Sequence, residues 1–221
     1  IKTIFIGGGT PTSLSDSLFE KLLYNIDEIL NLNLNESDVE YTVEANPKTI
    51  SHQKALTLKK YGVNRVSFGL QSSNPKELSN LGRVHNFEDL KESVTLLKNN
   101  GITDINIDLM YAIPDQTIET FKKSLNDVIG LSVTHISAYS LILEEGTKLY
   151  ELYNQNKLTI PTEDEDIFMY EEAIKILAKN GYNQYEISNF SLPGKECKHN
   201  ITYWKVDEYL GFGLSSHSFF C

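Results

Sequence analysis

The feature that most constrains the fold is a regular alternation of strand-like and helix-like segments along the chain. Short apolar runs rich in β-branched residues alternate with stretches whose apolar side chains recur every three or four positions. Each apolar run ends in a loop rich in Gly, Pro, Asn or Gln, which is typical of a parallel sheet with crossover helices. The expected strands are 2–6, 39–43, 65–70, 104–110 and 135–141, and the expected helices are 15–30, 51–60, 75–81, 87–99, 117–129 and 163–180.

These units predict an α/β fold of the partial, TIM-like (β/α)6 barrel type, because the strands are apolar and closely spaced in the sequence. A doubly wound open sheet is the alternative. The regular pattern covers residues 1–146, and residues 147–221 are expected to form an α+β extension with a short strand at 182–190. The chain begins with Ile1 inside an expected strand, so we expect the first strand of the barrel to lie upstream.

Composition excludes several classes of function. The formal net charge is −10 and no run of Lys and Arg forms a basic patch, so we expect no nucleic-acid partner. No apolar stretch in the sequence approaches the ~20 residues that span a bilayer, and we expect no signal peptide before the first strand. Cys197 and Cys221 are the only cysteines, too few for a disulfide framework, so we expect a cytoplasmic protein.

Glycines and polar side chains follow the expected strands. The carboxyl ends of parallel strands converge on one face, where ligands bind, and glycines there let a ligand approach the main chain. We therefore expect a small polar ligand at this face. The residues at these positions are Gly8, Gly9, Thr10, Glu44, Asn46, Gln71, Asp108, Ile142 and Glu144.

Each of these residues also has a structural interpretation. The glycine run could be a tight turn; it is not a P-loop, because no Gly-Lys-Ser/Thr follows, and it is a poor dinucleotide motif. Glu44 could be a solvated carboxylate, Gln71 could satisfy loop backbone, and Asp108 could cap a turn. Asp108 lies within the apolar run 105–110, however, where an unpaired charge is costly. Their joint occurrence at successive strand ends favours a site.

Five motifs occur in order along the chain: Gly7–Pro11, Glu44–Pro47, Arg65–Gln71, Leu81–His85 and Asn106–Tyr111. Together they resemble the radical S-adenosylmethionine proteins of the oxygen-independent coproporphyrinogen III oxidase group, essentially from end to end. The resemblance implies an S-adenosylmethionine site. It assigns backbone and hydroxyl contacts to Gly8, Gly9 and Thr10, and a polar contact with the nucleoside to Glu44. It assigns further S-adenosylmethionine contacts to Gln71, Arg83 and Asp108, which in the oxidase bind a second molecule of it. Ile142 takes a position beside the adenine.

The resemblance also implies a 4Fe–4S cluster held by three thiolates of a Cys-x-x-x-Cys-x-x-Cys loop. This chain has no such loop, and the spacing of Cys197 and Cys221 does not match it. We expect the cluster loop to lie upstream of Ile1. The chain by itself is then expected to hold no metal and to be catalytically inert.

A histidine- and aromatic-rich stretch near the end of the chain resembles the haem-chaperone branch of the group. His199–Trp204 is followed by Tyr209–Gly213 and by His217. This likeness implies that His199 binds haem iron, while Tyr203 and Trp204 stack on the porphyrin. Ordinary packing is the alternative for His199, and His52 and His135 are expected to be surface or strand residues.

The resemblance to this branch implies a protein that holds haem and passes it to an acceptor protein of unknown identity. It also implies weak membrane association of the complete protein. The alternative is the oxidase activity, in which a 5′-deoxyadenosyl radical drives decarboxylation of coproporphyrinogen III to protoporphyrinogen IX. A third interpretation is another radical enzyme that does not act on porphyrins.

Overall fold

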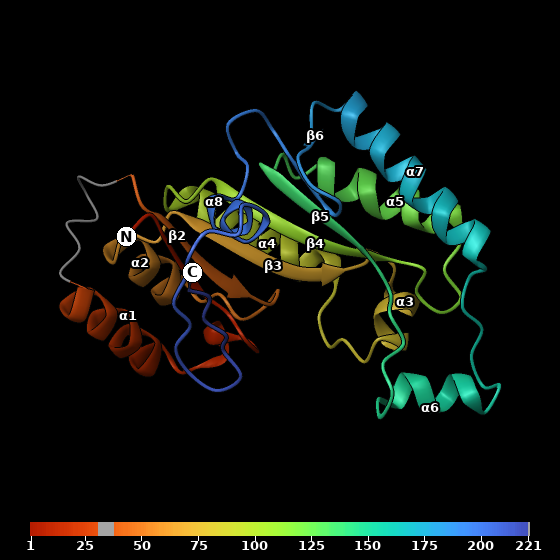
Figure 1. Ribbon diagram of the computed structural model, residues 1–221, viewed down its shortest axis with the longest axis horizontal. Helices are drawn as coiled ribbons and strands as arrows, with labels where there is room; N and C mark the ends of the chain where they lie inside the picture. The colour runs from red at the N-terminus through yellow and green to blue at the C-terminus, as the bar shows by residue number, and fades with distance from the viewer. Residues whose placement is uncertain (31–37, 221) are drawn as a thin grey trace.

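The computed structural model describes residues 1–30 and 38–220, and its central feature is one seven-stranded sheet (Figure 1). The strand order is β1-β2-β3-β4-β5-β7-β6. The first five strands are parallel and neighbour one another in chain order, so each connection between them is a crossover. These strands are β1 (Thr3–Ile6), β2 (Glu40–Ala45), β3 (Arg65–Gln71), β4 (Asp104–Tyr111) and β5 (His135–Ser140).

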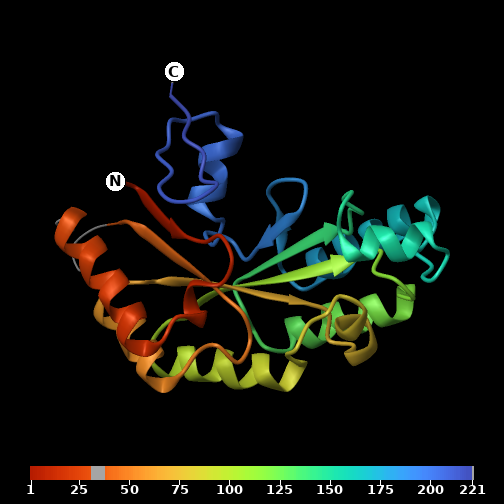
Figure 2. The same ribbon diagram turned by 90° about the horizontal axis from the view of Figure 1, so that it is seen from below.

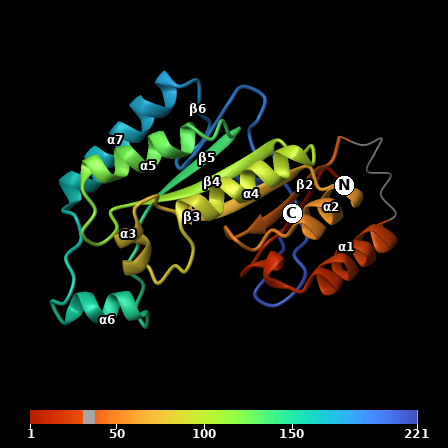
Figure 3. The same cartoon turned by 180° about the vertical axis from the view of Figure 1, so that it is seen from behind.

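The crossover helices cover one face of the sheet, as Figures 2 and 3 show. A doubly wound sheet carries such helices on both faces, so that alternative is wrong and the partial barrel is confirmed. Within the described residues the edge strands β1 and β6 do not pair with each other. The helices of this layer are α1 (Asp16–Leu30), α2 (His52–Lys60), α4 (Phe87–Asn99) and α5 (Ile118–Ile129), with the shorter η1 (Pro11–Ser13) and α3 (Pro75–Asn80) in the loops.

Side-chain caps fix where several helices begin. The Ser51 hydroxyl accepts a hydrogen bond from the Lys54 amide at the start of α2. Asn86 and Asp89 form a reciprocal capping box at the start of α4. Caps of this kind satisfy amides that have no partner within the helix, and each stabilises by about 1 kcal/mol. The expected boundaries of these helices therefore agree with the structure to within a residue.

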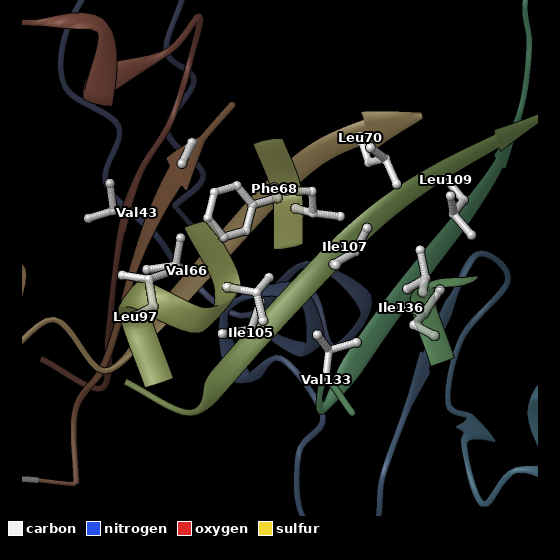
Figure 4. Packing of buried hydrophobic residues seen from close by; sticks show 14 of the residues in the cluster. Val43, Val66, Phe68, Leu70, Leu97, Ile105, Ile107, Leu109, Val133 and Ile136 are labelled. Carbon is white, nitrogen blue, oxygen red and sulfur yellow. The ribbon is translucent and has the colours of Figure 1, made fainter. Parts of the chain in front are cut away.

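The strands have one apolar face and one polar face because successive side chains alternate in direction. On β4, Ile105, Ile107 and Leu109 are completely buried in the core with the helices (Figure 4). Burying such a side chain stabilises the fold by roughly 1.5–3 kcal/mol. Asn106 and Asp108 alternate with them and face the opposite side. The same alternation on the neighbouring strands produces a polar surface on the face without crossover helices.

The C-terminal part differs in detail from the expectation. The strand expected at 182–190 is a hairpin, β6 (Asn183–Gln184) and β7 (Asn189–Ser191), because the intervening residues turn the chain so that Gln184 pairs with Phe190. β7 pairs antiparallel with β5, so the sheet continues past residue 146. Three further helices belong to this part: α6 (Lys148–Asn154), α7 (Glu163–Lys179), which packs against α5, and α8 (Lys198–Trp204), which lies by β1.

Among the described helices, none combines the length and the apolar character that crossing a membrane requires.

Candidate functional site

Most of the predicted site residues line one cavity of about 310 Å³, which we call the glycine-loop cavity. Its walls come from the loop after β1 and from the ends of β2, β3 and β4. The structure therefore brings together residues up to 99 positions apart in the sequence, as convergence of parallel strand ends predicts. The lining residues are Gly9, Thr10, Glu44, Ala45, Asn46, Ser67, Gly69, Gln71, Arg83 and Asp108.

The glycine loop lies directly against a carboxylate. Gly8 and Gly9 have φ of 79° and 85°, a left-handed conformation that glycine adopts without steric cost. The Gly8 amide donates a hydrogen bond of 3.1 Å to Glu44 Oε2. A side chain at Gly7 would place its Cβ 2.8 Å from the same carboxyl group. The glycines thus allow Glu44 to pack on the loop backbone.

Two polar side chains complete the rim of the cavity. Asn46 donates a hydrogen bond of 2.7 Å from Nδ2 to Thr10 Oγ1, which fixes the orientation of that hydroxyl. Gln71 lies at a register shift between β3 and β4 and has φ of 75°. Backbone strain of this kind in a non-glycine residue is concentrated at binding and active sites. Gln71 is only 8% exposed although its side chain lines a cavity.

The cavity contains two interacting carboxyl groups. Burial raises the pKa of Glu44, and the charge of Asp108 raises it further, against the lowering effect of the Gly8 hydrogen bond. Burial also raises the pKa of Asp108, although Asn106 donates a 2.7 Å hydrogen bond to it. A bound cation would offset the cost of burying both carboxyl groups in their ionised form. Arg83 on the same cavity suits an anionic group, so the site fits a ligand that carries both charges.

Other predicted residues lie elsewhere. Gly8 is outside the cavity wall and acts through its hydrogen bond to Glu44. Ile142 follows β5, is 77% exposed, and is not among the residues that line the cavity. Glu144 is also exposed.

His199 lines a second cavity of about 160 Å³ between the polar face of the sheet and α8, which we call the α8 cavity. Its wall shares Glu44, Ser67 and Asp108 with the glycine-loop cavity, so the two cavities are adjacent. The remaining lining residues are Phe5, Arg65, Asn106, His135, Ser137, Tyr139, Asn189, Cys197, Asn200 and Tyr203.

The imidazole of His199 is fully engaged. Its Nδ1 lies 2.8 Å from Thr3 Oγ1, and its Nε2 lies 2.8 Å from the Tyr203 hydroxyl. The ring stacks on Phe5 with centroids 5.0 Å apart. Burial lowers the pKa of His199, so the ring is neutral near pH 7. It could ligate a metal only if one of these hydrogen bonds opened.

Several polar residues of the α8 cavity were not anticipated from the sequence. His135 lies in β5, as one of its two expected interpretations has it, and its ring is buried between Asn106, 2.6 Å from its Nδ1, and Tyr185, 2.8 Å from its Nε2. Burial keeps its pKa well below the usual range. Strict alternation of polar and apolar residues in β3 and β4 is the signal that could have located Arg65, Asn106 and their neighbours.

Comparison with known proteins shows the family to which the chain belongs. Residues 1–128 match the model of the radical SAM superfamily, and the chain belongs to that superfamily. The superfamily implies S-adenosylmethionine and a 4Fe–4S cluster.

The chain is also similar to curated haem chaperones named HemW. It is 45% identical to HemW of Lactococcus lactis and 42% identical to HemW of Bacillus subtilis, over 99% of the chain and 57% of each relative. The chain thus spans about half the length of the curated relatives it matches. The solved structure of HemN, a coproporphyrinogen III oxidase of Escherichia coli, has the same fold, with a TM-score of 0.82 and 24% identity over 99% of the chain and 52% of HemN.

The residues present fit one implied group and not the other. The glycine-loop cavity offers carboxylates, a guanidinium and open backbone, which suit the zwitterionic S-adenosylmethionine. A cluster needs three thiolates, whereas the sequence contains two cysteines. Cys197 is buried with Sγ 3.4 Å from Glu40, and Cys221 lies outside the described residues. Residues 1–30 and 38–220 contain no group of three His, Cys, Asp or Glu placed to hold a metal.

Proposed function

We propose that the glycine-loop cavity binds S-adenosylmethionine and that the complete protein is a haem chaperone. The observation that carries the first part is the convergence of Gly9, Thr10, Glu44, Arg83 and Asp108 on one cavity. The second part is supported by the similarity to HemW proteins along nearly the whole chain.

In this proposal each wall of the cavity receives a different part of the ligand. Glu44 and Asp108 face the cationic sulfonium and ammonium groups, in place of the nucleoside contact that the resemblance implies for Glu44, and Arg83 pairs with the carboxylate. The backbone at Gly9 and the Thr10 hydroxyl bind the amino-acid end, while Gln71 serves as a further polar contact. Ile142 remains a predicted adenine contact.

The haem part of the proposal assigns iron ligation to His199. Tyr203 and Trp204 are 45% and 54% exposed on α8, so they offer aromatic surface beside that histidine. For Nε2 to reach iron, the hydroxyl of Tyr203 must move away from it. The proposal extends to a haem-acceptor protein, supported by the relatives' name of haem chaperone, and to a cytoplasmic location, supported by the composition. Weak membrane association is proposed from the family resemblance alone. The oxidase alternative is supported only at the level of fold, by HemN.

Two titrations of the full-length protein test the proposal. Calorimetry with S-adenosylmethionine should show binding that weakens by roughly 10- to 100-fold in Arg83→Gln, because a charge-assisted contact is lost. Haem titration followed by the Soret band should show weaker binding in His199→Ala. His52→Ala, an exposed histidine on α2, is the matched control. Unchanged haem affinity in His199→Ala would remove the ligand assignment.

A further inference from the structure

We propose that the α8 cavity is a binding site for a carboxylate group and that Arg65 receives this group. The proposal concerns a residue to which the resemblance described above assigns no role. Arg65 and Arg83 are the only arginines in the sequence, and each lines one of the two adjacent cavities.

Arg65 is a buried cation with unused hydrogen-bonding capacity. Arg65 is 3% exposed, and its Nε has no hydrogen-bond partner among the described residues. The one ion pair that the structure gives it is to Asp104, at 3.9 Å. The carboxylate of Asp104 is already bound by the Thr134 hydroxyl at 2.8 Å and by Lys195 at 3.2 Å. An incompletely paired buried charge is costly, and a bound anion would remove that cost.

The other titratable groups of the cavity leave Arg65 as its fixed charge. Burial raises the pKa of the carboxyl groups of Glu44 and Asp108 and of the thiol of Cys197, which favours their neutral forms. Burial likewise keeps His135 neutral. The positive charges of S-adenosylmethionine in the adjacent cavity would offset whatever negative charge Glu44 and Asp108 retain. Arg65 is the one arginine or lysine among the residues that line the α8 cavity, so it is the group that an entering anion would pair with.

The size of the cavity limits what part of a ligand can enter. A volume of about 160 Å³ is below the ~300 Å³ typical of sites that enclose a whole organic ligand. It suits a carboxylate on a short aliphatic arm. His199 and Tyr203 form an aromatic part of the same wall, and the exposed ring of Tyr203 can contact a larger body outside. If the proposed function holds, that arm is a propionate side chain of haem; a free short-chain carboxylate is the other source.

The first arm of the test uses sodium propionate with the full-length protein, with saturating S-adenosylmethionine present to occupy the glycine-loop cavity. Saturation-transfer NMR should detect bound propionate in the unmodified protein and in Lys157→Gln, which loses an exposed cation elsewhere. The signal should disappear in Arg65→Gln. Arg65→Lys keeps the positive charge but lacks the planar guanidinium group, so it should give an intermediate signal. This variant decides the test if Arg65→Gln does not fold. An unchanged signal in both Arg65 variants would overturn the proposal.

The second arm compares haem with haem dimethyl ester, which lacks free carboxylates. The unmodified protein should bind haem roughly tenfold more tightly than the ester, and Arg65→Gln should bind the two equally. Equal binding by the unmodified protein would exclude haem propionate as the occupant and leave propionate from the first arm as the ligand. If neither porphyrin binds, the proposed haem function fails, while the propionate arm still decides whether the α8 cavity is a carboxylate site.

Discussion

The two adjacent cavities differ in how the chain builds them. The glycine-loop cavity is formed mainly by residues at or just after strand ends, and local sequence signals mark them. The α8 cavity is formed by residues within the strands, such as Arg65 at the start of β3 and Asn106 inside β4, and is closed by a helix more than 90 residues beyond either of them. Loops that follow parallel strands meet on one face by topology alone, whereas a helix reaches its place only through particular contacts.

The contacts that hold α8 are few and specific. The carboxylate of Glu40 on β2 accepts hydrogen bonds from the amides of Lys198 and His199, at 2.8 and 2.9 Å, and from Cys197 Sγ at 3.4 Å. Thr3 and Phe5 on β1 hold the His199 ring. Separate perturbations should therefore affect one cavity more than the other, although the two share Glu44, Ser67 and Asp108.

The largest expected effect is on the glycine-loop cavity, from Gly7→Ala. The new Cβ would collide with the Glu44 carboxyl group and displace it from the Gly8 amide. Calorimetry should show S-adenosylmethionine affinity reduced by roughly 100-fold, the scale of a lost charge-assisted contact. Haem affinity should fall less, because the new Cβ also lies 2.8 Å from the ring of Phe5, which stacks on His199. Gly130→Ala, at the end of α5, is the control, and equal affinities in the two variants would contradict the account.

The opposite perturbation is Glu40→Ala, which removes the acceptor for three donors at the start of α8. The free energy of unfolding should fall by roughly 2 kcal/mol, because backbone amides lose a charged hydrogen-bond partner. Hydrogen exchange of the Lys198 and His199 amides should accelerate, while the S-adenosylmethionine affinity stays the same. Glu92→Ala, an exposed glutamate on α4, serves as the reference. Protected amides in Glu40→Ala would show that α8 is held by other contacts.

A finer comparison within the α8 cavity uses Tyr203→Phe. Removal of the hydroxyl frees His199 Nε2 from its 2.8 Å hydrogen bond, so haem affinity measured by the Soret band should rise by a factor of roughly 3 to 10. His199→Ala should change it in the opposite direction. If Tyr203→Phe and His199→Ala weaken haem binding alike, Tyr203 contacts haem through its hydroxyl instead.

The smallest effect concerns pH. The pKa of Asp108 is raised in the folded protein, so the folded state binds more protons than the unfolded state between the two pKa values. The free energy of unfolding is therefore highest at pH values below the pKa that Asp108 has in the unfolded chain, and it falls as the pH rises through this window. Asp108→Asn should remove that fall and raise the free energy of unfolding near pH 7. Chemical denaturation of both proteins across pH 4–8 measures it, and parallel stability profiles would contradict the prediction.

The sequence predicted the parallel sheet and the crossover helices because their periodicity and caps are local. It also predicted the carboxylates, glycines and arginine that the structure brings together in the glycine-loop cavity. It did not predict the β6–β7 hairpin or α8, since their positions depend on pairing with β5 and on Glu40, far away in the chain. Ile142 was selected because it follows an expected strand and because the resemblance implies an adenine contact there, and it is not among the residues that line the cavity.

The central claim is that Glu44 and Asp108 form a cation-binding wall for S-adenosylmethionine. The most direct test is calorimetric titration of the full-length protein and of Glu44→Gln and Asp108→Asn at pH 8, with Glu92→Gln and Asp207→Asn as exposed controls. We expect each cavity variant to bind roughly 10- to 100-fold more weakly and both controls to match the unmodified protein. Affinities in the two cavity variants equal to those of the controls would contradict the claim.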